Sequence, residues 1–241
     1  MKRSLLLAAA VACVASAALA GILGSDVKTT LPTIIPASSS SQVTLQLGPT
    51  STAAPATVYE CMTPGSSFLA TNATSPTDGL PYDEYGDDCH MATSGTLTEF
   101  TIGYFEGAAA SVDALITFYT NDAADGIIGA VVAGPYLVTG MPGGFVTATI
   151  TPPDSPMIPA NVWFAVQFSP GTAGLVIAGG PPTVGTSHDV FVDTGLYTPP
   201  PGLVFFSGNP VANFMIAIET DTPPVPVEVS TWGKIKAQYR D

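Results

Sequence analysis

The chain has 241 residues, of which 46% are hydrophobic and 10% are charged, a composition that favours a folded core over disorder. Its net charge is −13, and the stretch from Thr29 to Gly233 contains 17 of the 19 acidic residues but no Lys or Arg. This stretch offers no fixed cation for a phosphate and no Gly-rich phosphate loop, which excludes nucleic-acid binding and nucleotide binding as functions.

Residues 1–20 have the pattern of a secretory signal peptide. Lys2-Arg3 is a positive start, an apolar run follows over residues 5–19, and Ala18-Leu19-Ala20 is a small-residue cleavage site. We therefore expect cleavage before Gly21, leaving a secreted, periplasmic or surface-exposed chain with no transmembrane span. An uncleaved membrane anchor is the alternative, because the apolar run continues to Leu23.

The three cysteines divide between the signal peptide and the mature chain. Cys13 leaves with the signal peptide, unless it is a lipoprotein site, and Cys61 and Cys89 remain. An even pair in an exported chain favours a disulfide. Closing this loop would stabilise the fold by roughly 3–4 kcal/mol in the chain-entropy model. Two free thiols are the alternative.

Residues 21–40 are expected to be a polar lead-in, and residues 41–220 a single β domain. Apolar and polar residues alternate with the period of a strand over residues 43–47, 100–104, 112–118, 146–150, 162–168 and 214–218. Val162, Phe164, Val166 and Phe168 form the clearest of these strands, and we expect all four to face the core. About ten short strands with turns and no convincing helix between them predict an all-β, antiparallel two-sheet sandwich of jelly-roll type, with a barrel as the alternative.

The C-terminal end changes in composition. Residues 221–230 are rich in proline and are expected to be an extended linker. Residues 231–241 are expected to be a basic amphipathic tail with a short helix, which anchors the protein or recognises a partner. Its apolar stripe and basic group comprise Trp232, Lys234, Ile235, Lys236, Tyr239 and Arg240.

Four stretches of the chain stand out: Gly86-Asp87-Asp88, the expected strand Thr96–Tyr104, Ile116-Thr117-Phe118-Tyr119-Thr120-Asn121-Asp122, and Pro159-Ala160-Asn161-Val162-Trp163-Phe164-Ala165-Val166. Together they resemble a loosely defined group of secreted bacterial β-sandwich modules. This resemblance spans roughly residues 86–220, implies the sandwich fold and export, and supplies no catalytic residue. The segment from Ser230 to Arg240 is similar to short C-terminal tails of other exported bacterial proteins.

Residues 82–90 read as an acidic loop with four carboxylates in six positions, those of Asp83, Glu84, Asp87 and Asp88. Crowded carboxylates raise one another's pKa unless a cation lies between them. Ca²⁺ takes oxygen ligands, so this loop is a candidate calcium site, with a solvated acidic surface as the alternative. We expect no other cofactor.

The chain has two histidines, His90 and His188. A transition-metal site built from Cys89, His90 and His188 is a further alternative, and it would compete with the disulfide. Ser187, His188 and Asp189 are consecutive, so on a strand they point to opposite faces and cannot form a catalytic relay by themselves. Four carboxylates are available for glycoside hydrolysis, but no pattern pairs them. They belong to Glu60, Glu99, Glu106 and Asp113.

Aromatic side chains are candidates for a platform that stacks on sugar rings. The ligand-binding candidates are Trp163, Tyr119 and Tyr136, with Tyr104 beside them or in the core. We expect a non-catalytic structural or interaction module of the cell envelope or extracellular matrix. A carbohydrate-binding module that takes up a polysaccharide, assisted by calcium, is the first alternative, and a glycoside hydrolase is the second.

Overall fold

A computed structural model of the chain describes residues 28–29, 33–35, 40–49, 55–70, 84–122, 127–188, 190–193, 202–205 and 211–221. In these ranges the chain is all-β, and no helix is present that could cross a membrane. The strands are β1 (Lys28–Thr29), β2 (Thr33–Ile34), β3 (Ser41–Gln46), β4 (Pro55–Cys61), β5 (Ser67–Ala70), β6 (Glu84–His90), β7 (Gly95–Asp122), β8 (Ile127–Thr151), β9 (Met157–Ile158), β10 (Asn161–Ser169), β11 (Gly174–Ile177), β12 (Phe191–Asp193), β13 (Gly202–Phe205) and β14 (Ile216–Asp221).

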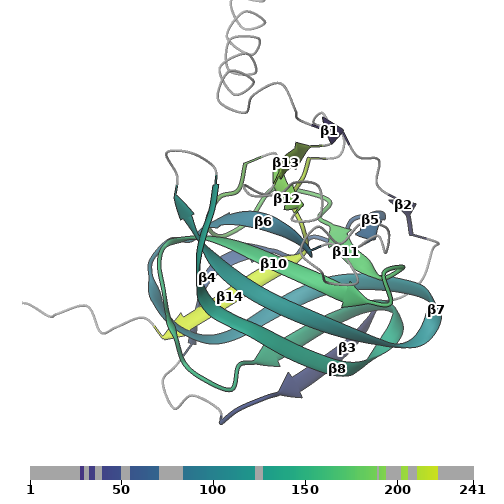
Figure 1. Ribbon diagram of the computed structural model, residues 1–241, viewed down its shortest axis with the longest axis horizontal. Helices are drawn as coiled ribbons and strands as arrows, with labels where there is room; N and C mark the ends of the chain where they lie inside the picture. The colour runs from purple at the N-terminus through teal and green to yellow at the C-terminus, as the bar shows by residue number, and fades with distance from the viewer. Residues whose placement is uncertain are drawn as a thin grey trace, which may run out of the picture.

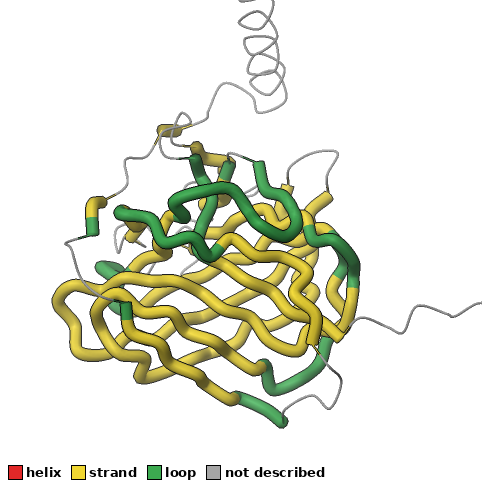
Figure 2. Tube along the Cα trace, turned by 180° about the vertical axis from the view of Figure 1, so that it is seen from behind, coloured by secondary structure: helices red, strands yellow, loops and turns green. Residues whose placement is uncertain are grey.

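The fourteen strands of the described ranges are joined by hydrogen bonds into one large, mostly antiparallel sheet (Figure 1). Its main path runs β1-β13-β12-β6-β10-β7-β11-β5-β2, and β14, β4, β8, β3 and β9 attach to this path through β7 and β8. Only β1 with β13 and β3 with β8 run parallel. Figure 2 shows the longer loops gathered beyond one end of the sheet.

Two long strands form the centre of the sheet. β7 has 28 residues and β8 has 25, and they pair from Phe100 opposite Ile150 to Asp122 opposite Ile127. Strands of globular proteins usually have about 3–10 residues, so strands this long have to bend. The register between β7 and β8 shifts at five places, and such bulges bend a strand and increase its twist. The sequence pattern predicted several short strands here because each turn-like segment was interpreted as a break.

The core forms on one face of the bent sheet. Val162, Phe164, Val166 and Phe168 of β10 are all fully buried in it, which confirms the face predicted for this strand. The ring of Phe164 lies 4.9 Å from that of Phe118 and 5.8 Å from that of Phe100, measured between ring centroids. Phe100 and Phe118 both belong to β7 and contact each other at 5.5 Å, so the two halves of β7 approach each other across the core.

β10 is buried on its second face as well. Trp163, Ala165 and Gln167 alternate with the core residues and are also buried. Trp163 packs in a second, small apolar cluster with Val190 and Val192. β6 pairs with β10 in an antiparallel register, so the residues of β6 that share this second face lie beside those of β10. This register positions the site described below.

One expectation from the sequence changes here. Residues 84–90 form strand β6 in the middle of the sheet rather than an exposed acidic loop, and Glu84, Asp87 and Asp88 are buried. Pairing with β10 and β12 supplies the hydrogen bonds that a strand of such polar sequence needs. The signal peptide, the proline-rich linker and the tail of residues 231–241 lie outside the described residues and stay predictions.

Candidate metal centre

Three side chains of types that commonly bind metal ions meet on one face of the sheet, at the C-terminal end of β6. Asp88 and His90 are two residues apart on this strand, so both point to the same face. His188 reaches them from a segment that pairs with the end of β6 through a bridge between Thr186 and His90. Nε2 of His90 lies 3.0 Å from Oδ2 of Asp88, and Nδ1 of His188 lies 2.5 Å from the same oxygen. The two imidazole nitrogens are 3.2 Å apart, so three potential ligand atoms form a small triangle.

The size of this triangle is close to that of a coordination site. Bonds of 2.0–2.1 Å in a tetrahedral site place the ligand atoms about 3.3 Å from one another. Two of the three separations, at 3.0 and 3.2 Å, are close to that spacing, and the third, at 2.5 Å, is shorter. A metal ion would therefore need only a small outward movement of the exposed His188 side chain.

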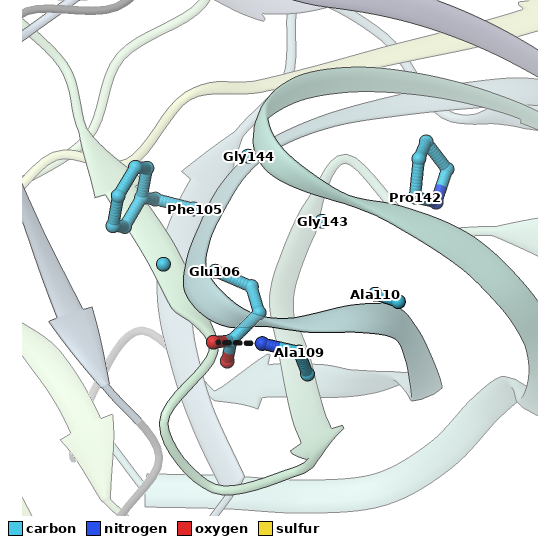
Figure 3. A pocket seen from close by; sticks show the side chains of 8 residues that line it. Phe105, Glu106, Ala109, Ala110, Pro142, Gly143 and Gly144 are labelled. Atoms are coloured by element: carbon cyan, nitrogen blue, oxygen red, sulfur yellow. Dashed lines mark hydrogen bonds between the residues drawn. The ribbon is translucent and has the colours of Figure 1, made fainter.

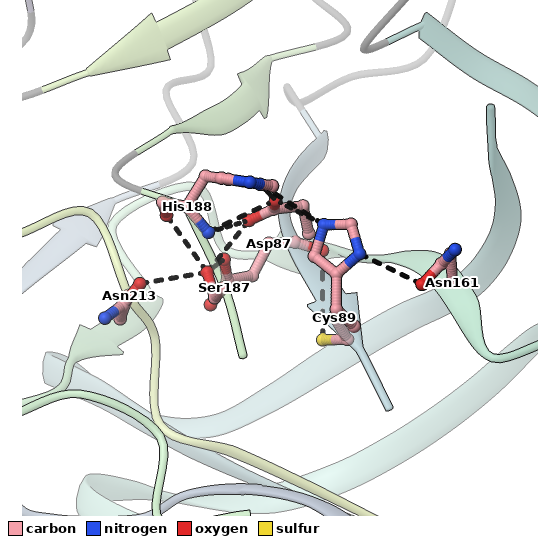
Figure 4. A network of polar contacts seen from close by, with 8 residues as sticks. Asp87, Cys89, Asn161, Ser187, His188 and Asn213 are labelled. Carbon is pink, nitrogen blue, oxygen red and sulfur yellow. Dashed lines mark hydrogen bonds and ion pairs between the residues drawn. The ribbon is translucent and has the colours of Figure 1, made fainter. Parts of the chain in front are cut away.

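The remaining polar atoms of Asp88 and His90 are held by other groups (Figure 4). Nδ1 of His90 lies 3.0 Å from Oδ1 of Asn161, which can only accept, so Nδ1 carries a proton. Nε2 then has the lone pair that a metal ion needs whenever the ring is neutral. Oδ1 of Asp88 accepts from the hydroxyl of Ser187 at 2.8 Å and from the backbone N–H of His188 at 3.0 Å. Each residue thus presents one defined atom to the centre, as orienting contacts around metal ligands do.

The electrostatics of the cluster follow from its buried carboxylate. Burial by itself would raise the pKa of Asp88, but the hydrogen bonds from His188, His90 and Ser187 outweigh it and lower the pKa below the usual value. The hydrogen bond to Asp88 in turn raises the pKa of both histidines, against the opposing effect of partial burial. In the metal-free protein the buried carboxylate of Asp88 therefore favours the protonated form of both imidazoles.

This coupling predicts the titration of the two histidines in metal-free protein. Both imidazoles should titrate above the ordinary pKa of about 6.5, and Asp88→Asn should return both to that range, since it removes the charge that holds the protons. NMR of the imidazole resonances measures this without assignment difficulty, because the chain has two histidines. Unshifted histidines in the wild-type protein would show that the triangle does not exist in solution.

Asp87 faces the other side of β6, toward the core. Its Oδ2 accepts from the backbone N–H of Phe214 at 2.9 Å, and its Oδ1 lies 2.9 Å from Oγ of Ser187. Burial and the neighbouring charge of Asp88 raise the pKa of Asp87 well above its usual value. The hydroxyl of Ser187 has one proton, so it donates to only one of these two carboxylates at a time.

A glycine allows the His188 segment to reach the site. Gly185 has a φ of +75°, a conformation that favours glycine, and a Cβ at this position would lie 2.6 Å from the carbonyl oxygen of His90. The residues on either side of it bridge to two different strands, Val184 to Glu60 of β4 and Thr186 to His90 of β6. The close approach at Gly185 brings Ser187 and His188 beside Asp88.

The structure does not gather the described residues predicted to bind calcium around one point. Asp83 lies outside the described residues, and Glu84 at the far end of β6 accepts a hydrogen bond from the hydroxyl of Tyr119 at 3.0 Å. Asp87 and Asp88 point to opposite faces of the strand. Their carboxylates come close only because both contact the hydroxyl of Ser187. Among the described residues, Glu84, Asp87 and Asp88 therefore do not form a set of oxygen ligands that converge on one point.

The predicted aromatic platform is not formed by these side chains. Trp163 is 1% exposed and Tyr136 is 4% exposed, so neither ring offers a face to a sugar. Tyr119 is partly buried, packs against the small cluster around Trp163 and donates its hydroxyl proton to Glu84. The prediction of a surface platform is therefore wrong for two different reasons. Trp163 and Tyr119 lie on the second face of β10, which is covered, and Tyr136 of β8 packs into the main core against Phe100.

Cys61 and Cys89 are free thiols in this structure, in contrast to the predicted disulfide. Sγ of Cys61 lies 3.5 Å from the carbonyl oxygen of Gly180, and Sγ of Cys89 lies 3.9 Å from that of Asp87. Burial raises the pKa of Cys61 to about 12 and raises that of Cys89 as well. Cys89 lies on the core side of β6, so it is not in the cluster with His90 and His188. The predicted transition-metal site of Cys89, His90 and His188 is therefore wrong in one residue, because Asp88 and not Cys89 meets the two histidines.

The carboxylates considered for hydrolysis have other partners. Glu106 lines a hollow of about 560 Å³ at the bend of β7 and β8, beside Phe105 and Pro142 (Figure 3). Its Oε1 accepts from the backbone N–H groups of Ala108 and Ala109, and its Oε2 accepts from the hydroxyl of Thr172. No second carboxylate lines this hollow, so it does not provide the facing acid pair of a glycosidase.

Two further candidates for hydrolysis, Glu60 and Asp113, also have structural partners. Glu60 accepts a hydrogen bond from Thr183, and Asp113 accepts one from the backbone of Gly140. Asp189, the third member of the consecutive Ser-His-Asp segment, lies outside the described residues. These contacts assign Glu60 and Asp113 roles in holding loops.

Comparison with known proteins finds no family model, no curated protein and no solved structure that matches this chain. The resemblance to secreted bacterial β-sandwich modules therefore stays a prediction.

Proposed function

We propose that this chain is an exported, non-catalytic β protein that binds a divalent transition-metal ion, Zn²⁺ foremost, through Asp88, His90 and His188. The observation that carries the proposal is the triangle of Oδ2, Nε2 and Nδ1 atoms, with no separation above 3.2 Å. The contacts of Asn161 and Ser187 support it, because they direct one atom of His90 and one atom of Asp88 toward a common point.

The donor set favours some ions over others. Two imidazole nitrogens and one carboxylate oxygen suit Zn²⁺, Co²⁺, Ni²⁺ and Cu²⁺, whereas Ca²⁺ prefers six to eight oxygen ligands. Zn²⁺ requires no particular d-electron geometry and accepts three protein ligands with further positions filled from outside. We therefore expect Zn²⁺ to bind and Ca²⁺ to be a poor competitor.

The wider role proposed for the chain is a structural or interaction module of the cell envelope or extracellular matrix. The signal-like residues 1–20 and the absence of Lys and Arg from Thr29 to Gly233 support export and an acidic surface. Contacts between Phe100 and Phe118 from the two halves of β7 support a sandwich-like packing of the bent sheet. A carbohydrate-binding role is the second candidate. In that role the sugar would bind at the metal site rather than on an aromatic platform.

Isothermal titration calorimetry with ZnCl₂ tests the proposal. We expect one Zn²⁺ per chain, binding that weakens as the pH falls because the raised pKa of both histidines makes protons compete, and no effect of CaCl₂. Glu99→Gln is the matched control, since it removes one carboxylate from β7, a strand that carries none of the three ligands. No heat of binding with Zn²⁺, Co²⁺ or Ni²⁺ would leave the cluster as a structural ion pair.

Asn161→Ala should lower the Zn²⁺ affinity by about 10–100-fold without removing a ligand. The reason is that Asn161 fixes the tautomer and the ring orientation of His90. Asn161→Asp keeps an acceptor at the same place and should retain binding. Calorimetry on both variants measures the difference, and equal affinities for Asn161→Ala and wild type would show that His90 is not a ligand.

A further inference from the structure

The metal site described above has three donors from the chain, one fewer than the smallest common coordination number of Zn²⁺. Oδ1 of Asp88 is already shared by Ser187 and the backbone of His188, so Asp88 offers one oxygen and not two. Among the described side chains, Asn161 is engaged by His90, and Cys89 lies on the other face of β6. The described residues therefore leave at least one coordination position for a donor from outside.

The open position faces the solvent. The side chain of His188 is 62% exposed and that of His90 is 18% exposed, whereas that of Asp88 is 2% exposed. An ion bound to all three atoms has the buried carboxylate behind it and the two imidazoles beside it. An external group can approach from the side of His188 without moving the sheet.

Charge selects the class of group that fits. A divalent ion with one carboxylate and two neutral imidazoles carries a net charge of about +1. One singly charged oxygen donor neutralises it. A doubly charged phosphate would leave excess negative charge in a chain whose net charge is −13 and that offers no Lys or Arg from Thr29 to Gly233.

We propose that the metal bound at Asp88, His90 and His188 completes its coordination with a single carboxylate from an external ligand, so that the protein captures carboxylate-bearing molecules through the metal. The inference rests on the proposed function, since without the metal the acidic surface repels such ligands. A free organic acid and an acidic sugar carry the same chemistry, and both act as one-point oxygen donors.

Absorption of the Co²⁺-loaded protein tests the proposal, because the visible bands of Co²⁺ respond to a change of ligand. Sodium acetate and sodium glucuronate should each shift the bands in a saturable way, whereas inorganic phosphate should need at least a tenfold higher concentration. A stronger response to glucuronate than to acetate would indicate that the protein recognises an acidic sugar. Equal responses would indicate that it recognises the carboxylate group alone. His188→Ala should abolish the response, and the exposed side chain makes unfolding of this variant unexpected.

Two results overturn the inference. If Co²⁺ binds but acetate changes nothing, the chain fills the coordination sphere by itself and only the inference fails. If phosphate binds as well as acetate or better, the charge argument is wrong. Calorimetry in the same buffer shows whether Co²⁺ binds at all, and a lack of binding contradicts the proposed function as well, so the two failures are distinguished.

Discussion

Phe164→Ala is expected to lower the free energy of unfolding by about 3–5 kcal/mol. The ring of Phe164 is fully buried and contacts Phe118 at 4.9 Å and Phe100 at 5.8 Å, which come from the two halves of β7. Removing the ring leaves a cavity where these halves meet, and close-packed interiors relax only partly around such a gap. Urea unfolding followed by tryptophan fluorescence measures the change.

Leu137→Ala is the control for this prediction. Leu137 is also a large apolar residue on a central strand, but it is 62% exposed. Its truncation should change the free energy of unfolding by less than about 0.5 kcal/mol, the usual range for surface substitutions. A loss below about 1 kcal/mol for Phe164→Ala, or equal losses for both variants, would contradict the assigned core.

Asp88→Asn is expected to reduce the Zn²⁺ affinity by about 100-fold or more, the upper end of what loss of an orienting contact alone costs. The substitution removes the only charged ligand and keeps a side chain of the same shape. The amide oxygen can still accept from Ser187 and from the backbone N–H of His188, so the local fold should persist. Calorimetry measures the affinity, and the melting temperature measured in parallel shows whether the variant is folded.

Glu99→Gln again serves as the control for the loss of one carboxylate and should bind Zn²⁺ as the wild type does. Wild-type affinity in Asp88→Asn would mean that the ion is held elsewhere, and the assignment of the ligands would be wrong. Loss of binding in both variants would point to a general effect of net charge rather than to a site.

The sequence predicts the all-β class and the inward face of β10 because both depend on local patterns. Val162, Phe164, Val166 and Phe168 alternate without interruption, and their burial follows from the period of a strand. The burial of Trp163 on the other face could not be predicted this way, because it depends on Val190 and Val192, which approach from a distant part of the chain.

The amino-acid composition of β6 predicts the wrong local structure at the site. Acidic residues and glycine usually indicate a loop, yet here the neighbouring strands β10 and β12 impose an extended conformation. The spacing of Asp88 and His90 was a usable signal, since residues two apart on a strand share a face while Cys89 between them does not. The approach of His188 to within 3.2 Å of His90, across 98 residues of sequence, is a tertiary contact that the pattern does not contain.

X-ray diffraction from crystals grown with ZnCl₂, with data collected on both sides of the zinc absorption edge, tests the central claim most directly. The account predicts one anomalous peak at about 2.0–2.2 Å from Nε2 of His90, Nδ1 of His188 and Oδ2 of Asp88, with an additional ligand from solvent or buffer on the exposed side. A fully occupied zinc at another position with no peak at these three atoms, or their hydrogen-bonded triangle unchanged in Zn²⁺-saturated crystals, would contradict it.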